Sequence, residues 1–283
     1  MEPILGILIQ FAKGQFHMPG ETLFEKARDK IERATKHIDY IYRMIENQCP
    51  YRYYFETDTI AGQNKTYSET DETVVDEITL RCSDALLNLH TALDLAYADI
   101  VLPLVKTDEQ KENIKFPFSR TPGKFEIAAK KQYAHKIGDR FLEDLVALRP
   151  YAMPRGNELL YFLHEMTTPE CYATFILTID FKEITVEEVR VQIPGFLPNV
   201  AGDVTVKMTN KGQDFSWSFP PSSMYDRLVD AAPLSGVVKK EIDIPYDLHF
   251  EGRHLGSHMI IVSELNQFVD VTNNVLEVLE AYR

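Results

Sequence analysis

The stretch that decides the fold is Thr73–Val105, TVVDEITLRCSDALLNLHTALDLAYADIVLPLV. Apolar side chains recur in it at alternating steps of three and four residues, as they do along the buried face of an α-helix. The members of this stripe are Val75, Ile78, Cys82, Ala85, Leu89, Ala92 and Ala96, with Leu86, Leu93 and Ile100 beside it. Leu87, Leu95 and Tyr97 fall on other faces. We therefore expect this helix to contact partners on more than one side, at the centre of a bundle.

Signals at both ends bound this central helix. Thr73 followed by Asp76 resembles a capping box, in which two side chains satisfy the first backbone N–H groups of a helix. Pro103 stands where the periodic pattern ends, and proline cannot continue a helix. The spacing thus predicts a helix over 74–104.

Two other segments carry helical stripes long enough to pack on the central helix. The segment Glu21–Asn47 has a narrow, coiled-coil-like seam, and Ser257–Tyr282 has a broad apolar stripe that must be buried. The two stripes consist of Phe24, Ala27, Ile31, Ala34, Ile38, Ile41 and Ile45 in the first, and Ile261, Leu265, Phe268, Val271, Val275, Val278 and Tyr282 in the second. We predict that the three helices pack together although they are far apart in sequence.

Shorter elements are predicted between these helices. Aromatic and β-branched residues on either side of Ala61-Gly62 predict a short hairpin. Helices are expected over Lys124–Leu148 and Asn157–Met166. From Cys171 onward the period changes to that of strands, and the Asn210-Lys211-Gly212 turn predicts that the strands on its two sides form a hairpin.

These elements define an α+β protein, an antiparallel helical bundle with an antiparallel β-rich insertion before the last helix. The predicted division places residues 1–170 and 257–283 in the bundle and 171–256 in the insertion. Because the last helix returns to the bundle, the two parts should fold as one unit.

Composition excludes several classes of protein. The chain has 283 residues and a net charge of −13, a field that repels nucleic acid and anionic membrane. Three cysteines, Cys49, Cys82 and Cys171, show no paired spacing, which favours free thiols in a reducing compartment. The apolar run Ile4–Phe11 lacks a basic leader and is too short to span a bilayer. We expect a cytoplasmic protein.

One local basic segment departs from the acidic average. It holds Arg120, Lys124, Lys130, Lys131, Lys136 and Arg140, diluted by Glu126 and Asp139. Such a run is usually a solvated helix face, and a ligand-binding patch is the alternative.

The central helix also carries a resemblance. SDALLNLHTALDLAYADIV resembles GDALHNLRSALDHLVYQL, a motif of a family of uncharacterised bacterial proteins of similar length. Further landmarks of that family follow in order, and they are similar to KARDKIERATKHIDYIYRMIENQCPYRYYFE, IKFPF, ALRPY and LLYFLHEMTTPECYA of this chain. The resemblance covers residues 23–173 and implies a helical domain of the HEPN type. HEPN domains act on phosphodiesters with an Arg and a His of one helix, and they usually pair through bundle helices.

Residue by residue, the cationic part of the family's pattern is missing here. His90 stands at the Arg position and Leu95 at the His position. The family's second cluster, Asp-Lys-His-Arg, reads Glu170, Cys171, Tyr172 and Ala173. The polar residues that survive are Asp84, Asn88, Asp94, His164 and Glu165.

His90 and Asp94 are the catalytic candidates, because side chains four residues apart on a helix can meet and a His-carboxylate pair suits general-base work. A pair that only stabilises the helix is the other reading. The binding candidates are Asp84, Asn88, His164 and Glu165. His254 and His258 have four-residue spacing but no carboxylate cluster to complete a metal site, so no metal and no cofactor are expected.

Three functions stay open at this point. The first is a non-catalytic, HEPN-like binding or interaction protein, which forms a homodimer or binds another protein. The second is an HEPN-type RNase with an atypical site. The third is a small-molecule binding protein with a pocket between bundle and sheet.

Overall fold

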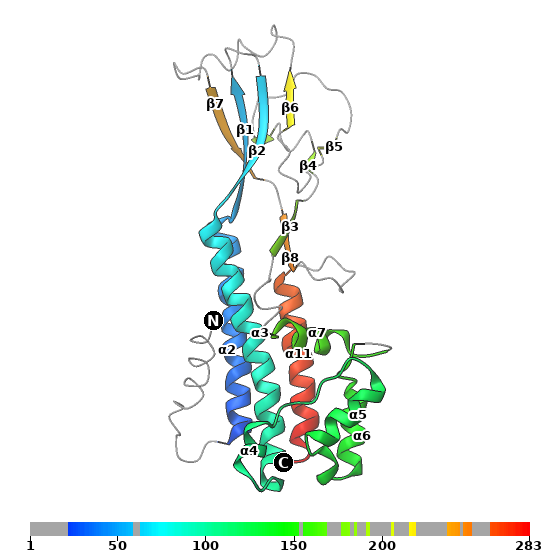
Figure 1. Ribbon diagram of the computed structural model, residues 1–283. Coiled ribbons are helices and arrows are strands. Elements are labelled where there is room, and N and C mark those ends of the chain that lie inside the picture. The colour runs from blue at the N-terminus through cyan, green and yellow to red at the C-terminus, as the bar shows by residue number, and fades with distance from the viewer. Residues whose placement is uncertain are drawn as a thin grey trace. The chain divides into compact units, whose positions relative to one another are not determined.

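The computed structural model describes residues 22–58, 63–152, 155–168, 177–181, 184–185, 191–192, 205–206, 215–218, 237–243, 246–250 and 261–283 (Figure 1). The chain falls into two compact units. The first comprises residues 1–34, 86–165 and 268–283, and the second comprises 35–85 and 166–267. Each of the three long helices contributes one portion to each unit.

The long helices are α2 (Leu23–Gln48), α3 (Glu72–Val101) and α11 (Ile261–Glu280), and they pack together as predicted (Figure 1). The predicted stripes are buried almost throughout, and small shifts occur at their ends, where Met44, Val74 and Leu279 are buried. Ile45, Val75 and Val278 are half-buried instead. The periodicity of apolar residues was therefore sufficient to predict this packing.

The start of α3 differs from the prediction. The helix begins at Glu72, and Oδ1 of Asp71 accepts a hydrogen bond from the Val74 N–H at 3.3 Å. The carbonyl oxygen of Asp71 accepts from Val74 and Val75 at 3.0 Å each. The predicted capping box of Thr73 and Asp76 is therefore wrong, because Asp71 is an equally good capping residue and stands two positions earlier.

The first unit also contains a series of short helices. They are the 3₁₀-helix η1 (Leu102–Leu104), α4 (Asp108–Glu112), α5 (Pro122–Lys131), the 3₁₀-helix η2 (Ala134–Lys136), α6 (Asp139–Leu148) and α7 (Glu158–Met166). The predicted single helix Lys124–Leu148 is wrong. Tyr133 has a left-handed backbone with φ of 67° and Gly138 has φ of 147°, so the chain reverses between α5 and α6.

Tyr97 confirms that α3 has partners on a second side. Its side chain is fully buried, and its hydroxyl donates a hydrogen bond to the Gln132 carbonyl at 2.7 Å. Its ring lies 5.9 Å from the ring of Phe116 and 6.1 Å from that of Phe141. The short helices are thus held on α3 by a buried aromatic cluster with a satisfied hydroxyl.

The second unit contains an antiparallel sheet with the strand order β6-β2-β1-β7. Its strands are β1 (Tyr51–Asp58), β2 (Gln63–Thr70), β6 (Phe215–Ser218) and β7 (Val237–Ile242). The predicted hairpin of β1 and β2 is confirmed, with Tyr51 opposite Thr70 and Asp58 opposite Gln63. Nζ of Lys239 on β7 donates a hydrogen bond to Oε1 of Glu69 on β2 at 2.7 Å. The same Nζ lies 3.6 Å from the centre of the Tyr54 ring.

Two further strand pairs belong to this unit. β3 (Leu177–Phe181) pairs with β8 (Tyr246–Phe250), and β4 (Ile184–Thr185) pairs with β5 (Thr205–Val206). The turn of the predicted hairpin, Asn210–Gly212, lies outside the described residues, and the described residues of its two strands pair elsewhere, β5 with β4 and β6 with β2. The edge of β2 offers unpaired backbone groups to β6, and local turn signals do not reveal this alternative partner.

The division into domains at residues 170 and 257 stays a prediction.

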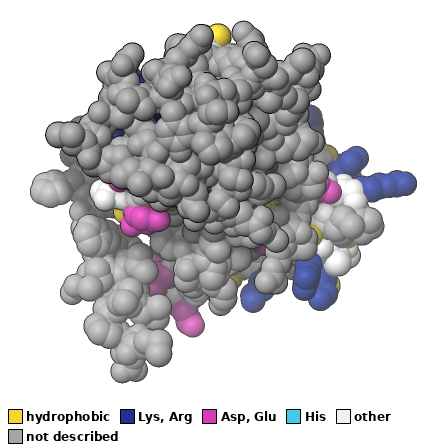
Figure 2. All heavy atoms as spheres, turned by 90° about the horizontal axis from the view of Figure 1, so that it is seen from above, with side chains coloured by type: hydrophobic (Ala, Val, Ile, Leu, Met, Phe, Trp, Pro, Cys, Tyr) yellow, Lys and Arg dark blue, Asp and Glu magenta, His cyan; other side chains and the backbone are white. Residues whose placement is uncertain are grey.

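Charge is unevenly distributed along the sequence. Residues 115–155 contain nine Lys or Arg and four Asp or Glu, whereas the full chain contains 30 and 43. In Figure 2, Lys and Arg side chains are visible along the right edge of the view. The segment 115–155 is therefore locally basic in an acidic protein, although α6 within it carries one arginine and three carboxylates.

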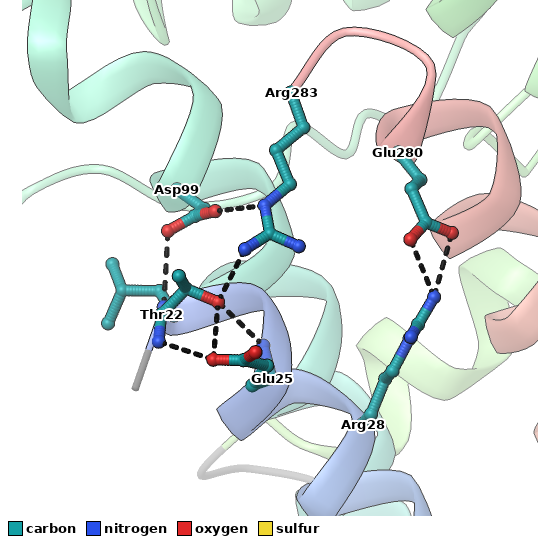
Figure 3. Close-up of polar contacts among 7 residues, drawn as sticks. Thr22, Glu25, Arg28, Asp99, Glu280 and Arg283 are labelled. Carbon is teal, nitrogen blue, oxygen red and sulfur yellow. Dashed lines mark hydrogen bonds and ion pairs between the residues drawn. The ribbon is translucent and has the colours of Figure 1, made fainter. Parts of the chain in front are cut away.

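Polar contacts join the three long helices within the first unit (Figure 3). Thr22 and Glu25 form a capping box at the start of α2, where the Thr22 N–H donates to Glu25 at 2.7 Å and the Glu25 N–H donates to Thr22 at 3.2 Å. Arg283 donates to Thr22 Oγ1 at 2.9 Å and pairs with Asp99 of α3 at 3.5 Å. Arg28 pairs with Glu280 at 2.6 Å. These contacts fix the register of α2, α3 and α11 in this unit.

Among the described residues, one helix, Glu72–Leu104, is long and apolar enough to cross a membrane by length and composition. The core helix of a soluble protein passes the same test. Its apolar stripe is buried against protein, from Ile78 to Ile100.

Candidate functional site

Three of the predicted site residues come together in the first unit. His90 and Asp94 lie on α3, and His164 lies on α7. Nε2 of His90 is 3.2 Å from Nδ1 of His164, and Nδ1 of His90 is 3.7 Å from Oδ2 of Asp94. We call His90, Asp94 and His164 the histidine cluster. Residues 74 positions apart in the sequence thus meet at one place.

The segment between α4 and α5 closes the histidine cluster on another side. The ring of Phe118 stacks on that of His164, with centroids 4.3 Å apart and an interplanar angle of 6°. The Phe116 N–H donates a hydrogen bond to Oδ1 of Asp94 at 2.8 Å. This segment is IKFPF, the part of the sequence that resembles a family landmark, and here it supplies both a stacking ring and a backbone donor.

Burial controls the charge of the cluster. It lowers the pKa of His90 to about 4, and the charges of His164 and Lys115 act in the same direction. Burial also lowers the pKa of His164. The pKa of Asp94 rises to about 6 because of burial, although the Phe116 N–H and Lys115 oppose the rise. At neutral pH both imidazoles are therefore neutral, and Asp94 is the charged member.

The two imidazoles share one hydrogen bond, so one ring nitrogen donates and the other accepts. If Nδ1–H of His90 faces Asp94, Nε2 of His90 accepts from Nδ1–H of His164. Asp94, His90 and His164 then stand in the order of a proton relay, in which only the hydrogen bond between the two histidines is formed. The distance of 3.7 Å between His90 and Asp94 is too long for a hydrogen bond, so their attraction is electrostatic only.

The other binding candidates do not all join this cluster. Glu165 hydrogen-bonds Tyr161, where burial, followed by the charge of Glu165, raises the pKa of the phenol. Asn88 is half-buried on α3. Asp84 belongs to the second unit, where its charge acts on His37 of α2. The structure thus brings three of the six predicted residues together.

The sequence did not predict a second polar cluster, which is centred on Arg81 of α3. Nη1 of Arg81 lies 3.5 Å from Nδ1 of His37, and its Nε donates to Glu77 at 2.8 Å. Its guanidinium lies 4.6 Å from the centre of the Tyr40 ring. Spacing along α3 could not show which residue of α2 Arg81 meets. Arg81 is committed to three neighbours, so this group has little capacity for an anion.

Glu264 of α11 was also missed, although it lies three residues after Ile261 and four before Phe268, on the apolar side of the predicted helix. It is only 3% exposed, and burial raises the pKa of its carboxyl to about 7. Among the residues that the structure describes, no hydrogen-bond donor meets this carboxyl. Its charge contributes to the raised pKa of the buried Cys82 thiol, after burial itself.

An open hollow of about 360 Å³ lies between α6 and the end of α11. It is lined by Asp144, Ala147, Leu148, Val278 and Ala281. The Tyr282 hydroxyl donates a hydrogen bond to Asp144. Since the lining is largely apolar and its one carboxylate already has a partner, the hollow offers little specific chemistry.

Within the described parts of the chain, no three His, Cys, Asp or Glu side chains are placed to hold a metal ion. The free cysteines described there are Cys49, which is exposed, and Cys82, which is buried. Cys171, His254 and His258 lie outside the described residues.

Comparison of the chain with protein-family models, with curated proteins and with solved structures finds no match.

Proposed function

We propose that the protein works by binding rather than catalysis, as a non-catalytic HEPN-like interaction protein. The observation that carries this proposal is the state of His90. One of its ring nitrogens contacts His164, the other faces Asp94, and its pKa of about 4 keeps it neutral at neutral pH. A neutral, internally bonded imidazole holds α3 and α7 together but offers no cation to a ligand.

The chemistry of phosphodiester cleavage supports the same conclusion. Cleavage adds negative charge to the phosphate, and enzymes stabilise it with preorganised cations or donors, each worth about 3 kcal/mol. The resemblance places His90 and Leu95 where the family has Arg and His, and Cys171, Tyr172 and Ala173 where it has Lys, His and Arg. A net charge of −13 weakens the attraction of a phosphate further.

Incubation of the purified protein with single-stranded RNA at low salt and without metal tests the proposal. We expect no cleavage. The pair His90→Arg with Leu95→His should restore little, because the second cationic cluster would still be missing. Cleavage that is lost in His90→Ala would show that the protein is an enzyme.

The alternative is an RNase with an atypical site, and one observation favours it. The order Asp94, His90, His164 could pass a proton, and the charge of Lys115 acts on all three members. An active relay requires an ionised Asp94, whose pKa is about 6. Under this alternative, cleavage would rise between pH 5 and pH 7 and would disappear in His164→Phe, which keeps a ring to stack on Phe118.

We further propose that the protein forms a homodimer. Leu87 of α3 is 42% exposed, outside the buried stripe of its helix, and the resemblance to HEPN domains implies pairing through bundle helices. Light scattering at micromolar concentration should give twice the monomer mass, and Leu87→Glu should give the monomer. A monomeric wild-type protein would count against this proposal.

A further inference from the structure

The outer face of α5 combines an exposed apolar side chain with three lysines. Ile127 is 69% exposed, the largest exposure of any isoleucine or leucine described on the helices. Lys124, Lys130 and Lys131 are exposed as well. We call Lys124, Ile127, Lys130 and Lys131 the α5 face.

Helical spacing makes these four side chains neighbours. Lys124 and Lys130 are each three residues from Ile127, and Lys131 is four residues from it, so all three surround the isoleucine on the helix surface. The opposite side of α5 carries Phe125 and Ala129, which are fully buried. The core therefore needs the inner side of α5 and makes no use of the outer one.

The lysines of the α5 face are largely uncommitted. Lys130 lies 3.9 Å from Glu126, a loose and exposed pair. Within the described part of the chain, neither Lys124 nor Lys131 has an ion-pair partner. Arg120 and Lys136, which precede and follow α5 in the sequence, are exposed as well. The local field is thus positive around an apolar centre.

We propose that the α5 face binds an acidic segment of a partner protein that carries an apolar side chain. The carboxylates of the segment would pair with Lys124, Lys130 and Lys131, and its apolar side chain would cover Ile127. Charge complementarity attracts and orients such a segment, and the buried isoleucine adds affinity that does not depend on salt. This inference rests on the proposed binding function and names the class of partner.

The acidic remainder of the chain argues for a short segment rather than a long polyanion. Residues 115–155 hold nine of the 30 basic residues but only four of the 43 acidic ones. A nucleic acid or an anionic bilayer extends beyond the basic region and is repelled by the rest of the surface, over a screening distance of about 8 Å at physiological salt. A short acidic segment stays within the basic region.

Fluorescence anisotropy with the full chain tests the inference. The probe is a labelled synthetic peptide of about 16 residues in which Glu and Leu alternate at helical spacing. We expect binding that weakens with rising salt. In Lys124→Glu with Lys131→Glu, the affinity should fall by at least about tenfold, because two attractive charges become repulsive. Ile127→Ser should weaken binding at high salt as well.

Two controls make the result decisive. Lys106→Glu with Lys111→Glu changes the net charge by the same amount at exposed sites outside the α5 face and should leave the affinity unchanged. A peptide with Ser in place of Leu should bind more weakly than the original. Equal loss of affinity in both double variants, no binding of the Glu-Leu peptide, or tighter binding of single-stranded RNA or of anionic vesicles would each overturn the inference. None of these outcomes depends on whether the protein cleaves RNA, so the two proposals can fail separately.

Discussion

Two carboxylates of the long helices, the half-buried Asp94 and the buried Glu264, differ in their surroundings. Asp94 of α3 accepts a hydrogen bond from the Phe116 N–H at 2.8 Å and lies 3.7 Å from His90. Glu264 of α11 is 3% exposed and meets no hydrogen-bond donor among the described residues. Burial raises the pKa of both, to about 6 in Asp94 and to about 7 in Glu264.

The two sites should therefore respond differently to pH. A carboxyl whose pKa is raised by folding contributes stability at low pH, and this stability is lost as the pH rises. For Asp94 the loss begins near pH 3.8 and is complete above about pH 6. The lowered pKa of His90 acts in the opposite sense, because its contribution is lost as pH falls from 6.5 through about 4. The two contributions to stability offset each other in the histidine cluster. Among the described residues, no lowered histidine pKa accompanies the raised pKa of Glu264 in this way. A polar group buried with partners is tolerated over a wide pH range, and an isolated one is a weak point.

The largest effect is expected when α11, which carries Glu264, is removed. Seven apolar side chains of this helix are buried, and each contributes about 1.5–3 kcal/mol, together as much as the whole stability of a typical domain. A chain ending at Gly256 should be insoluble or molten. Circular dichroism and denaturant unfolding measure this. A cooperative, two-state transition in the 1–256 fragment would refute the shared bundle.

At the satisfied site, Asp94→Ala leaves the Phe116 N–H buried without an acceptor. We expect a loss of about 2 kcal/mol in the free energy of unfolding, since an unsatisfied buried donor costs about 1–3 kcal/mol. Asp94→Asn keeps an acceptor oxygen and should lose less than half as much. Urea unfolding at pH 7 compares the two variants. Equal losses would mean that the charge of Asp94, and not its hydrogen bond, matters.

At the isolated site, Glu264→Gln and Glu264→Leu should stabilise the protein at pH 8. A rise of the pKa to about 7 corresponds to at most about 3 kcal/mol, of which we expect about 1–2 kcal/mol after screening by solvent. The gain should shrink as the pH falls from about 7 and should vanish below 4.5, where the carboxyl is protonated in the folded and unfolded states alike. Thermal unfolding as a function of pH checks this. If a variant kept the pH profile of the wild type, ionisation of Glu264 would not be the cause of the pH dependence.

The smallest effect is expected at the exposed pair of Arg28 and Glu280. Their side chains are 59% and 43% exposed, so solvent screens their attraction. Arg28→Ala should change the free energy of unfolding by less than about 1 kcal/mol. A larger loss, measured by the same urea unfolding, would mean that the contacts in Figure 3 act as one network.

The amino-acid sequence by itself determined the three long helices and the faces on which they pack. Their stripes follow from a period of 3.6 residues, and this local signal is strong because each helix is long. The sequence also indicated His90, Asp94 and His164. For His90 and Asp94 the spacing of four residues was enough, and His164 was chosen through the resemblance alone.

Only the tertiary structure decided which groups meet across the chain. The break at Tyr133, the pairing of β6 with β2, the contact of Arg81 with His37 and the raised pKa of Glu264 all depend on neighbours distant in sequence. Periodicity places Glu264 on the buried side of its helix, but it does not show which groups of other helices meet its carboxyl there. The charge of a buried group depends on its desolvation and its hydrogen-bond partners, and both are properties of the folded chain.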